Sequence, residues 1–257
     1  MAVGIRNYQK MRTFGLIGYP LAHSFSKKYF TEQFEREQED NCSYELFPLE
    51  NIEGITSLIL SDQSLSGLNV TIPHKVSVLP YLNEMDDAAE KIGAANCIAV
   101  TRNGAEITLK GYNTDAYGFE ESLKPLLKDY HTKALVLGDG GAARAVKYVL
   151  NKLGICYESV VRTTIAGAIL YDDLTEEMVR THKVIINTTP VGTFPHVDAS
   201  PAIPYQYLTG QHLAYDLVYN PEETQFLQKA KSQGAVIKNG LEMLHLQADR
   251  SWYIWNS

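Results

Sequence analysis

The sequence predicts an α/β protein of two domains, and three observations indicate this fold class. Short apolar runs typical of buried parallel strands recur along the chain, beginning with residues 13–18. Stretches with the apolar spacing of helices lie between these runs, so strands and helices alternate. A second rhythm of the same kind begins near Lys133, and 257 residues are enough for two small domains, each with its own core.

The first domain is predicted to start with the strand at 13–18 and a helix that follows Ser24. Ser24 stands where a helix N-cap would, and aromatic residues recur behind it at helical spacing. Asn103-Gly104 is a strong signal for a two-residue hairpin turn. Pro73 fits the first turn of a further helix. The other predicted elements are strands at 42–49, 65–71, 97–101 and 106–110, and a helix at 51–60.

The second domain repeats strand–helix–strand units, which predict a parallel sheet covered on both faces. The best candidate linker is Lys128–Lys133, and the last helical stretch, Leu241–Trp255, is expected to return to the first domain. We therefore assign residues 11–115 and 239–257 to one domain and 116–238 to the other. The predicted strands here are Ala134–Leu137, a strand ending at Val161, Val184–Ile186, Leu213–Val218 and Ala235–Ile237, with helices at Ala142–Leu153 and Pro221–Ser232.

Composition and charge exclude several classes of protein. The net charge of −7, without any run of Lys and Arg, argues against a nucleic-acid partner. The sequence has no apolar run of the roughly 20 residues that a membrane span needs. The three cysteines and seven histidines show no spacing typical of disulfide frameworks or metal sites, so we expect no metal. The first ten residues lack the apolar core of a signal peptide, and a cytoplasmic location is expected.

A glycine-rich turn marks a candidate nucleotide site at the start of the second domain. Gly138-Asp-Gly-Gly-Ala-Ala fits the pattern G-x-G-x-x-G/A between an apolar strand and a helix. In a Rossmann-type domain such glycines allow a tight turn and close approach of a pyrophosphate to the helix N-terminus. An ordinary glycine-rich turn is the alternative. We assign Gly138, Gly140, Gly141 and Ala142 as cofactor contacts, and an acid at Asp139 must point away from the phosphates or be neutralised.

The end of the next strand distinguishes NAD from NADP. NAD enzymes usually place an acid there to hold the ribose 2′-hydroxyl, whereas residues 160–164 contain none. Arg162 offers a guanidinium for a 2′-phosphate, and Thr163 and Thr164 offer hydroxyl groups. A solvated arginine at a strand end is the alternative interpretation. The sequence therefore favours NADP as the cofactor.

Eight sequence blocks together identify a family resemblance. The block at 18–26 is similar to G-x-P-x-x-H-S-x-S, and the block at 69–75 to N-V-T-x-P-x-K. All eight blocks occur in the order found in the shikimate dehydrogenase family, and together they resemble that family over roughly residues 13 to 255. The chain departs from the family pattern at Lys27, Cys97 and Val161, and the last of these adjoins Arg162. The remaining blocks are Gly93–Asn96, Gly111–Asp115, Gly138–Arg144, Asn187–Gly192, Asp216–Tyr219 and Gly240–Gln247.

The resemblance implies a set of residues that bind the substrate. Ser24 and Ser26 would hydrogen-bond the shikimate carboxylate at a helix start, where backbone N–H groups add positive potential. Simple N-capping by Ser24 is the alternative. The residues implied to bind the ring hydroxyls are Asn69, Thr71, Asn96, Tyr219 and Gln247.

The resemblance also implies that Lys75 and Asp115 carry the catalysis. Oxidation of a secondary alcohol removes its proton while a hydride leaves, and a lysine shielded from water can act as the base. Asp115 would hold the lysine and a substrate hydroxyl in place. Burial lowers the pKa of a lysine while a nearby carboxylate raises it, and the sequence leaves that balance open. Asp87, Leu217 and Gly240 are assigned to the cofactor by the same resemblance.

The expected function is the reversible NADP-dependent oxidation of shikimate to 3-dehydroshikimate, a step towards chorismate and the aromatic amino acids. The expected partners are therefore small molecules, with neither nucleic acid nor membrane, and the protein is expected to be a monomer or homodimer. Three alternatives remain: a family member that prefers quinate or NAD, a methylenetetrahydrofolate dehydrogenase, and a non-catalytic NADP-binding sensor. An intact pair at Lys75 and Asp115 argues against the sensor.

Overall fold

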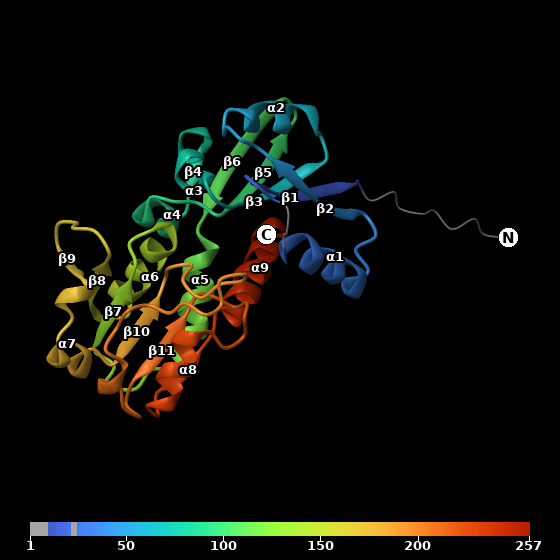
Figure 1. The fold of residues 1–257 in the computed structure, drawn as a ribbon. Helices are drawn as coiled ribbons and strands as arrows, with labels where there is room; N and C mark the ends of the chain where they lie inside the picture. The colour runs from blue at the N-terminus through green and yellow to red at the C-terminus, as the bar shows by residue number, and fades with distance from the viewer. Residues whose placement is uncertain (1–9, 22–24) are drawn as a thin grey trace. The chain divides into compact units, whose positions relative to one another are not determined.

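The structure, a computed structural model, describes residues 10–21 and 25–257 and divides into two compact units. The first unit comprises the described residues up to Thr114 together with Ser251–Ser257, and the second comprises Asp115–Arg250. Each unit has its own sheet with helices (Figure 1). The predicted α/β class with two domains is therefore confirmed. The units divide at Ser251, inside the last helix. The assignment of residues 239–257 to the substrate domain stays a prediction.

The first unit contains a six-stranded mixed sheet in the order β2-β1-β3-β5-β6-β4. β1 pairs in parallel with both β2 and β3, while β5 is antiparallel to β3 and β6. The carboxyl ends of β1, β2 and β3 consequently meet at one edge of the sheet. The strands are β1 Arg12–Gly18, β2 Cys42–Pro48, β3 Leu65–Val70, β4 Glu84–Met85, β5 Cys97–Asn103 and β6 Glu106–Tyr112.

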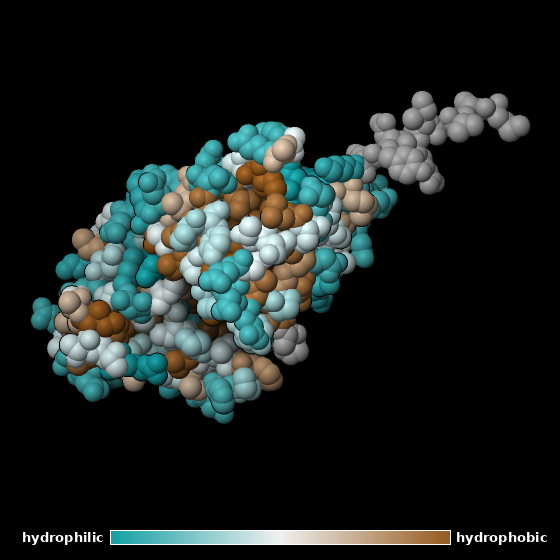
Figure 2. Space-filling view, turned by 90° about the horizontal axis from the view of Figure 1, so that it is seen from above, coloured by the Kyte–Doolittle hydropathy of each residue, from teal (hydrophilic) through white to brown (hydrophobic). Residues whose placement is uncertain are grey.

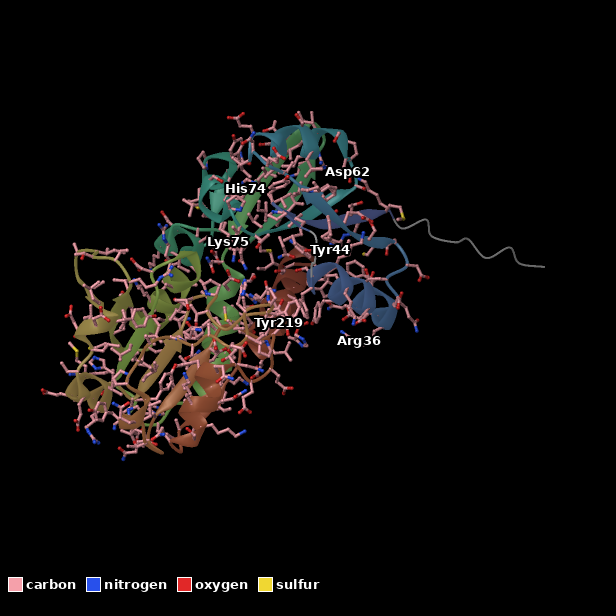
Figure 3. The ribbon with its side chains drawn as sticks, viewed as in Figure 1. Arg36, Tyr44, Asp62, His74, Lys75 and Tyr219 are labelled. Atoms are coloured by element: carbon pink, nitrogen blue, oxygen red, sulfur yellow. The ribbon has the colours of Figure 1, made fainter. Side chains whose placement is uncertain are left out.

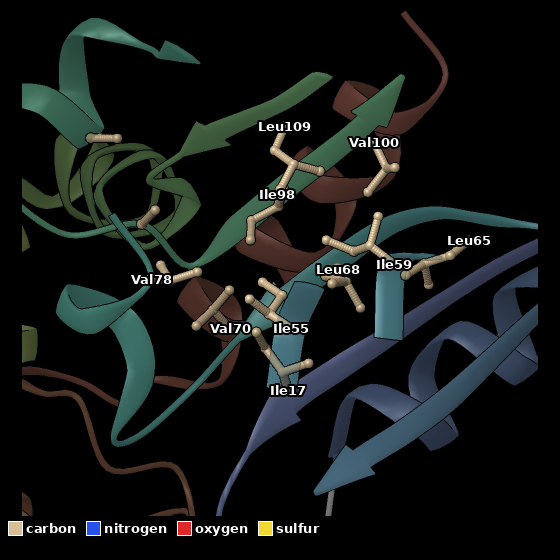
Figure 4. Close-up of a cluster of buried hydrophobic side chains, with 12 residues drawn as sticks. Ile17, Ile55, Ile59, Leu65, Leu68, Val70, Val78, Ile98, Val100 and Leu109 are labelled. Carbon is tan, nitrogen blue, oxygen red and sulfur yellow. The ribbon is translucent and has the colours of Figure 1, made fainter. Parts of the chain in front are cut away.

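Aliphatic side chains fill the core on one side of this sheet. Ile17 of β1, Leu68 of β3 and Ile98 of β5 are fully buried and meet Ile55 of helix α2 (Figure 4). The alternation of apolar residues along these strands explains why one set faces this core. The helices of the unit are α1 Phe25–Glu37, α2 Gly54–Ser61, α3 His74–Ser77 and α4 Asp87–Ile92.

Aromatic side chains form a second cluster, which includes the end of the chain. Helix α9 spans Leu241–Trp255, and its last residue stacks on Phe14 of β1 with ring centroids 4.8 Å apart. The Trp255 ring also lies 5.3 Å from Phe30 of α1 and donates a hydrogen bond to the Ile98 carbonyl. These contacts confirm that the C-terminal helix returns to the first domain.

The hairpin between β5 and β6 turns one residue later than predicted. Asn103 pairs with Glu106 as the last pair of the ladder, so Gly104 and Ala105 form the loop. Gly104 has a φ of +63°, which glycine adopts without steric cost. Glycine therefore suits the first loop position better than Asn103, the residue predicted there. The ladder therefore includes Asn103 as a strand residue.

The second unit contains a six-stranded parallel sheet in the order β12-β11-β10-β7-β8-β9. The predicted parallel sheet is therefore confirmed. Its strands are β7 Lys133–Leu137, β8 Cys156–Val161, β9 Ala168–Leu170, β10 Val184–Asn187, β11 Leu213–Asp216 and β12 Val236–Lys238. Its helices are α5 Thr114–Leu123, α6 Gly141–Lys152, α7 Glu176–Thr181, α8 Gln225–Ser232 and most of α9, with α5 beginning at the unit boundary.

Two local predictions for this unit are wrong. The proposed linker Lys128–Lys133 lies within the unit, because buried His131 accepts a bond from Lys128 N and contacts the Gln211 carbonyl through Nε2. Helix α8 begins at Gln225 instead of Pro221. The Thr224 side chain accepts a hydrogen bond from Leu227 N and caps the helix there.

The surface mixes hydrophilic and hydrophobic residues on the face seen in Figure 2. Among the exposed large apolar residues are Ile72, at 73%, and Phe194, at 67%. None of the described helices is both long and apolar enough to cross a membrane.

Candidate active site

The carboxyl edge of the first sheet brings two of the sequence blocks together. β1 and β3 are parallel neighbours, and Thr71 N donates a hydrogen bond of 2.9 Å to Ile17 O just past their ends. A Cβ on Gly18 would collide with the Thr71 methyl group, so the glycine permits this close approach. Ligands of open α/β sheets bind outside the carboxyl ends of parallel strands, which is the position of Thr71.

Lys75 lies in the short helix α3, directly after this edge. Its neighbour His74 is buried, and the His74 Nε2 atom lies 2.7 Å from Leu49 O (Figure 3). The Lys75 carbonyl accepts a hydrogen bond of 2.8 Å from Ala95 N, while its side chain is half-buried. Histidine and carbonyl therefore fix the backbone from which the lysine projects.

Asn69 and Asn96, both predicted to bind substrate hydroxyls, are buried beside each other in the first unit. Asn69 Nδ2 lies 3.4 Å from the Asn96 carbonyl and 3.0 Å from Ser251 Oγ. Tyr44 donates to Asn69 Oδ1 at 2.8 Å. Asn96 Oδ1 accepts from Thr114 N at 2.6 Å, and Asn96 Nδ2 lies 3.0 Å from Thr114 Oγ1. The two side chains are thus held by protein partners.

The predicted carboxylate site falls only partly within the described residues. Ser24 lies outside them. Ser26 lies in the first turn of α1 and is hydrogen-bonded to the Tyr44 hydroxyl. Burial holds the pKa of Tyr44 well above its usual value. Tyr44 was not predicted as a site residue, because nothing in the sequence of its strand indicates that its hydroxyl bonds to Ser26 and Asn69.

Asp115 is the residue after Thr114 and lies in the first turn of α5. One helical turn later, Gly118 allows α9 to approach closely, since an added Cβ would lie 3.1 Å from Gln247 N. Asp115 therefore lies on the same face of α5 that meets α9 near Gln247. The Gln247 side chain donates a 3.0 Å hydrogen bond to Leu244 O and is half-buried.

The glycine-rich turn in the second unit has the geometry of a phosphate cradle. Gly138 has a φ of +102°, which favours glycine, and its N–H donates to Val160 O. A Cβ added at Gly140 or Gly141 would meet nothing within 4 Å, so both backbones face open space. Helix α6 has no acidic residue in its first turn and no side-chain cap. The N-terminal N–H groups therefore suit an anion.

The acid in this turn is neutralised within the second unit. Asp139 forms an ion pair with Lys147, which lies two turns along α6. An acid beside bound phosphates must point away or be neutralised, and the ion pair with Lys147 neutralises Asp139. Ala142 follows in the first turn of the same helix.

Arg162 follows β8, which pairs with β7 at the sheet edge that carries the glycine turn. Arg162, Thr163 and Thr164 are exposed, and no ion pair involving Arg162 is present within the described part of the chain. An exposed guanidinium at this strand end fits the 2′-phosphate of NADP. The residues present therefore fit the cofactor that the sequence predicts.

Leu217 and Gly240, both assigned to the cofactor, lie against each other. A side chain at Gly240 would collide with the Leu217 carbonyl, and Gly240 N donates to Val218 O. Tyr219, assigned to the substrate, follows in the same segment and is 40% exposed (Figure 3). The loop after β11 thus carries both assignments.

A buried carboxylate that sequence reasoning did not single out holds this loop. Asp216 is fully buried at the end of β11 and accepts hydrogen bonds from Asn187 Nδ2 at 2.9 Å and Thr224 Oγ1 at 2.6 Å. It also accepts a bond from Val218 N. Burial raises the pKa of Asp216 to about 6, although these bonds oppose the rise. The available signal was a polar residue at the end of an apolar run, which occurs at both Asn187 and Asp216.

Asp87 lies in the first turn of α4, the helix that leads into the block at 93–96. It is exposed and forms an ion pair with Lys91 at 2.8 Å, while the preceding Asp86 caps the helix. Within residues 10–21 and 25–257, no group of three or more His, Cys, Asp and Glu side chains could hold a metal ion.

The two sheets, one of them parallel with a glycine-rich turn, define a two-domain α/β protein of the Rossmann type. A family model described as the shikimate dehydrogenase substrate binding domain matches residues 16–98. The shikimate dehydrogenase (NADP(+)) of Caldanaerobacter subterraneus subsp. tengcongensis is 39% identical, over 95% of this chain and 91% of the relative. This chain therefore belongs to the shikimate dehydrogenase family, as the sequence blocks predicted.

Solved structures agree with this assignment. Shikimate 5-dehydrogenase from Thermus thermophilus, in complex with NADP(H) and shikimate, is 32% identical with a TM-score of 0.81 and covers 95% of this chain and 93% of that one. Shikimate 5-dehydrogenase from Listeria monocytogenes, in complex with shikimate and NAD, is 25% identical with a TM-score of 0.82. That match covers 96% of this chain and 92% of the Listeria chain.

Proposed function

We propose that this protein catalyses the reversible oxidation of shikimate by NADP⁺ to 3-dehydroshikimate and NADPH, a step towards chorismate and the aromatic amino acids. The observation that carries the proposal is similarity along almost the whole chain to a relative named shikimate dehydrogenase (NADP(+)). Lys75 and Asp115, the two residues that the chemistry needs most, are both present. The enzyme acts on small molecules in the cytoplasm, as a monomer or homodimer.

Lys75 is the acid/base of the proposed reaction. Oxidation transfers a hydride from the carbinol carbon of shikimate and releases the hydroxyl proton, which the lysine amine accepts. In the reverse direction the ammonium returns that proton to the ketone oxygen. Asp115 orients the lysine and a substrate hydroxyl, and the backbone bond from Ala95 N to Lys75 O fixes the helix that carries the lysine.

The substrate is held by hydroxyl and amide side chains. Ser24 and Ser26 bind the carboxylate, and helix α1 supplies backbone N–H groups beside Ser26. The ring hydroxyls are bound by Asn69, Thr71, Asn96, Tyr219 and Gln247.

The cofactor site lies on the second unit. NADP⁺, when bound, supplies the hydride acceptor. Gly138, Gly140, Gly141 and Ala142 hold the pyrophosphate at the start of α6, and Arg162 with Thr163 binds the 2′-phosphate. Leu217, Gly240 and Asp87 also bind the cofactor.

Turnover in four mixtures tests the proposal against its nearest alternatives. Formation of reduced cofactor is measured with shikimate or quinate, each with NADP⁺ or NAD⁺. We expect the highest kcat/KM with shikimate and NADP⁺. A preference for quinate or for NAD⁺ would reassign the substrate or the cofactor within the family, and the Listeria neighbour bound to NAD makes the second comparison necessary. Binding without turnover in all four mixtures would favour a sensor.

A further inference from the structure

A chain of hydrogen bonds in the first unit links side chains from six separate segments. It runs from Ser26 to Tyr44, then to Asn69, Ser251, Thr114 and Asn96. Three of these six residues, namely Ser26, Asn69 and Asn96, belong to the proposed substrate site. Tyr44 and Ser251 belong to no block of the family resemblance, yet they connect the others.

The connecting residues are in positions where they can act only through their neighbours. Tyr44 is 3% exposed and Ser251 is fully buried. Tyr44 lies on β2 and Ser251 near the end of α9, 182 positions after Asn69. Both hydroxyls meet the Asn69 amide, one at each end of it, so together they fix the orientation of that side chain.

The bonds also determine which atom Asn69 can offer a ligand. Nδ2 carries two protons, and these point to Ser251 Oγ at 3.0 Å and to the Asn96 carbonyl at 3.4 Å. Oδ1 accepts one bond, from the Tyr44 hydroxyl, and has a second lone pair. The carbonyl of Asn96 prevents the amide from flipping, because a flip would place two oxygens together.

We propose that Tyr44 and Ser251 are positioning residues for the substrate site, which hold Asn69 as a hydrogen-bond acceptor towards one ring hydroxyl of the substrate. The inference rests on the proposed function for the identity of that substrate. Burial keeps the Tyr44 hydroxyl protonated, as its raised pKa indicates, so it stays a donor to Asn69 across the working pH range. The specificity of the site therefore depends on two residues that do not touch the substrate.

The test compares Tyr44→Phe and Ser251→Ala with matched controls from the second unit. Tyr205→Phe removes a hydroxyl that donates to Pro201 O at 2.8 Å, and Ser122→Ala removes a buried hydroxyl that bonds to Tyr215. We expect Tyr44→Phe and Ser251→Ala each to raise the KM for shikimate about three- to tenfold, the size of one neutral hydrogen bond. The KM for NADP⁺ should stay unchanged, and the controls should leave both values unchanged.

Shikimate analogues that each lack one ring hydroxyl separate positioning from general loss of structure. The effect of Tyr44→Phe should disappear for one analogue, the one without the hydroxyl that donates to Asn69, and persist for the others. An equal loss with every analogue, or an equal loss in the controls, would overturn the inference.

Calorimetric binding of shikimate, measured beside turnover, keeps this test distinct from that of the proposed function. A wild type that binds shikimate without oxidising it would contradict the proposed reaction, while the binding constants of the variants would still decide the roles of Tyr44 and Ser251. A wild type that does not bind shikimate would overturn both.

Discussion

Arg162 and Lys75 owe their proposed roles to different kinds of neighbours. Arg162 is exposed at the end of β8, on the sheet edge that carries the glycine turn, and an exposed cation there is available to an anionic ligand. Lys75 is half-buried, and its backbone is tied to Ala95. The motif that contains each residue was readable in the sequence, while these surroundings were not.

Replacing Arg162 by Ala should weaken NADP⁺ binding by about 1.5–3 kcal/mol, the range for a hydrogen bond to a charged group, and leave NAD⁺ almost untouched. NAD⁺ ends in a 2′-hydroxyl and cannot form the ion pair. Calorimetric titration with each cofactor, at low and high salt, measures the difference, which should shrink with salt.

Arg180→Ala is the matched control, because Arg180 is also exposed and forms an ion pair with Glu176 on its own helix, α7. It should change neither affinity. Equal weakening of NADP⁺ and NAD⁺ by Arg162→Ala would show that Arg162 does not read the phosphate, and Val161 would then be the first residue to examine.

At the scale of single residues, the sequence predicted the motif residues but not the side chains that hold them. The blocks at 69–75 and 93–96 placed Asn69 and Asn96 correctly in one unit. Tyr44 and Ser251 were not predicted, because their hydrogen bonds to Asn69 span 25 and 182 positions in the sequence. These bonds depend on the order of the strands and on the return of α9 to the first unit. A buried asparagine needs hydrogen-bond partners, but the sequence alone does not indicate which residues they are.

The residue that caps helix α8, Thr224, also helps to hold the loop that carries Leu217 and Tyr219. Thr224 caps the helix by accepting a bond from Leu227 N and also donates to the buried carboxylate of Asp216. Asp216 in turn holds Val218 N in the loop that carries Leu217 and Tyr219. The first turn of α8 and this loop are therefore fixed by one buried carboxylate.

Thr224→Ala should lower the free energy of unfolding by roughly 2–4 kcal/mol, since a cap and a buried bond to a charged group are both lost. The matched control is Thr175→Ala at the start of α7, where the side chain only caps Met178 N, and it should cost about 1 kcal/mol. Urea denaturation measures both values.

The same comparison has a predictable pH dependence. Because the pKa of Asp216 is raised to about 6, its carboxyl is ionised above that pH and then depends most on the Thr224 donor. The loss in Thr224→Ala should therefore be larger near pH 8 than near pH 5, as the linkage of protonation to stability requires. Equal costs for Thr224→Ala and Thr175→Ala would contradict the role assigned to Asp216.

Most elements were predicted from apolar spacing, and each of the following exceptions has a local physical cause. The hairpin is shifted because φ at Gly104 fits the first loop position, and α8 starts late because Thr224 is the better cap. Strands β4 and β9 were not predicted. They have two and three residues, too few for a period to be visible, and exist because neighbouring strands offer them hydrogen bonds.

For the molecule as a whole, acid stability should depend on His131 and His212, two of the buried histidines of the second unit. Nδ1 of His131 accepts a bond from Lys128 N, and Nδ1 of His212 accepts one from Thr209 N. Each Nε2 faces a backbone carbonyl. Burial lowers the pKa of both histidines, and protonation at Nδ1 would break the bond made there.

A lowered pKa means that the folded protein binds fewer protons than the unfolded chain, in which histidine has a pKa of about 6.5. The stabilising contribution is therefore complete above that pH and is lost as the pH falls through the lower pKa of the folded state. The free energy of unfolding, measured between about pH 5 and pH 8, should fall less steeply on the acid side in His131→Gln/His212→Gln than in the wild type.

His196→Gln provides the control, because His196 is exposed. Its pH profile should match that of the wild type. If the double variant keeps the wild-type slope, His131 and His212 do not govern acid stability.

The central claim is that the protein transfers a hydride from shikimate to NADP⁺ with Lys75 as the acid/base. One measurement tests it directly: turnover of shikimate that carries deuterium on the carbon that becomes the ketone, followed by mass analysis of the NADPH. Wild type, Lys75→Ala and the control Lys110→Ala are compared. Lys110 is a half-buried lysine on β6 that pairs with Glu84.

We predict that wild type and Lys110→Ala place the deuterium in NADPH at similar rates. Lys75→Ala should lower kcat by roughly 10²–10⁴, the usual contribution of a positioned acid/base group, while the KM for shikimate changes much less. Near-native kcat in Lys75→Ala would contradict the role of the lysine, and NADPH without deuterium, or no NADPH from the wild type, would contradict the reaction itself.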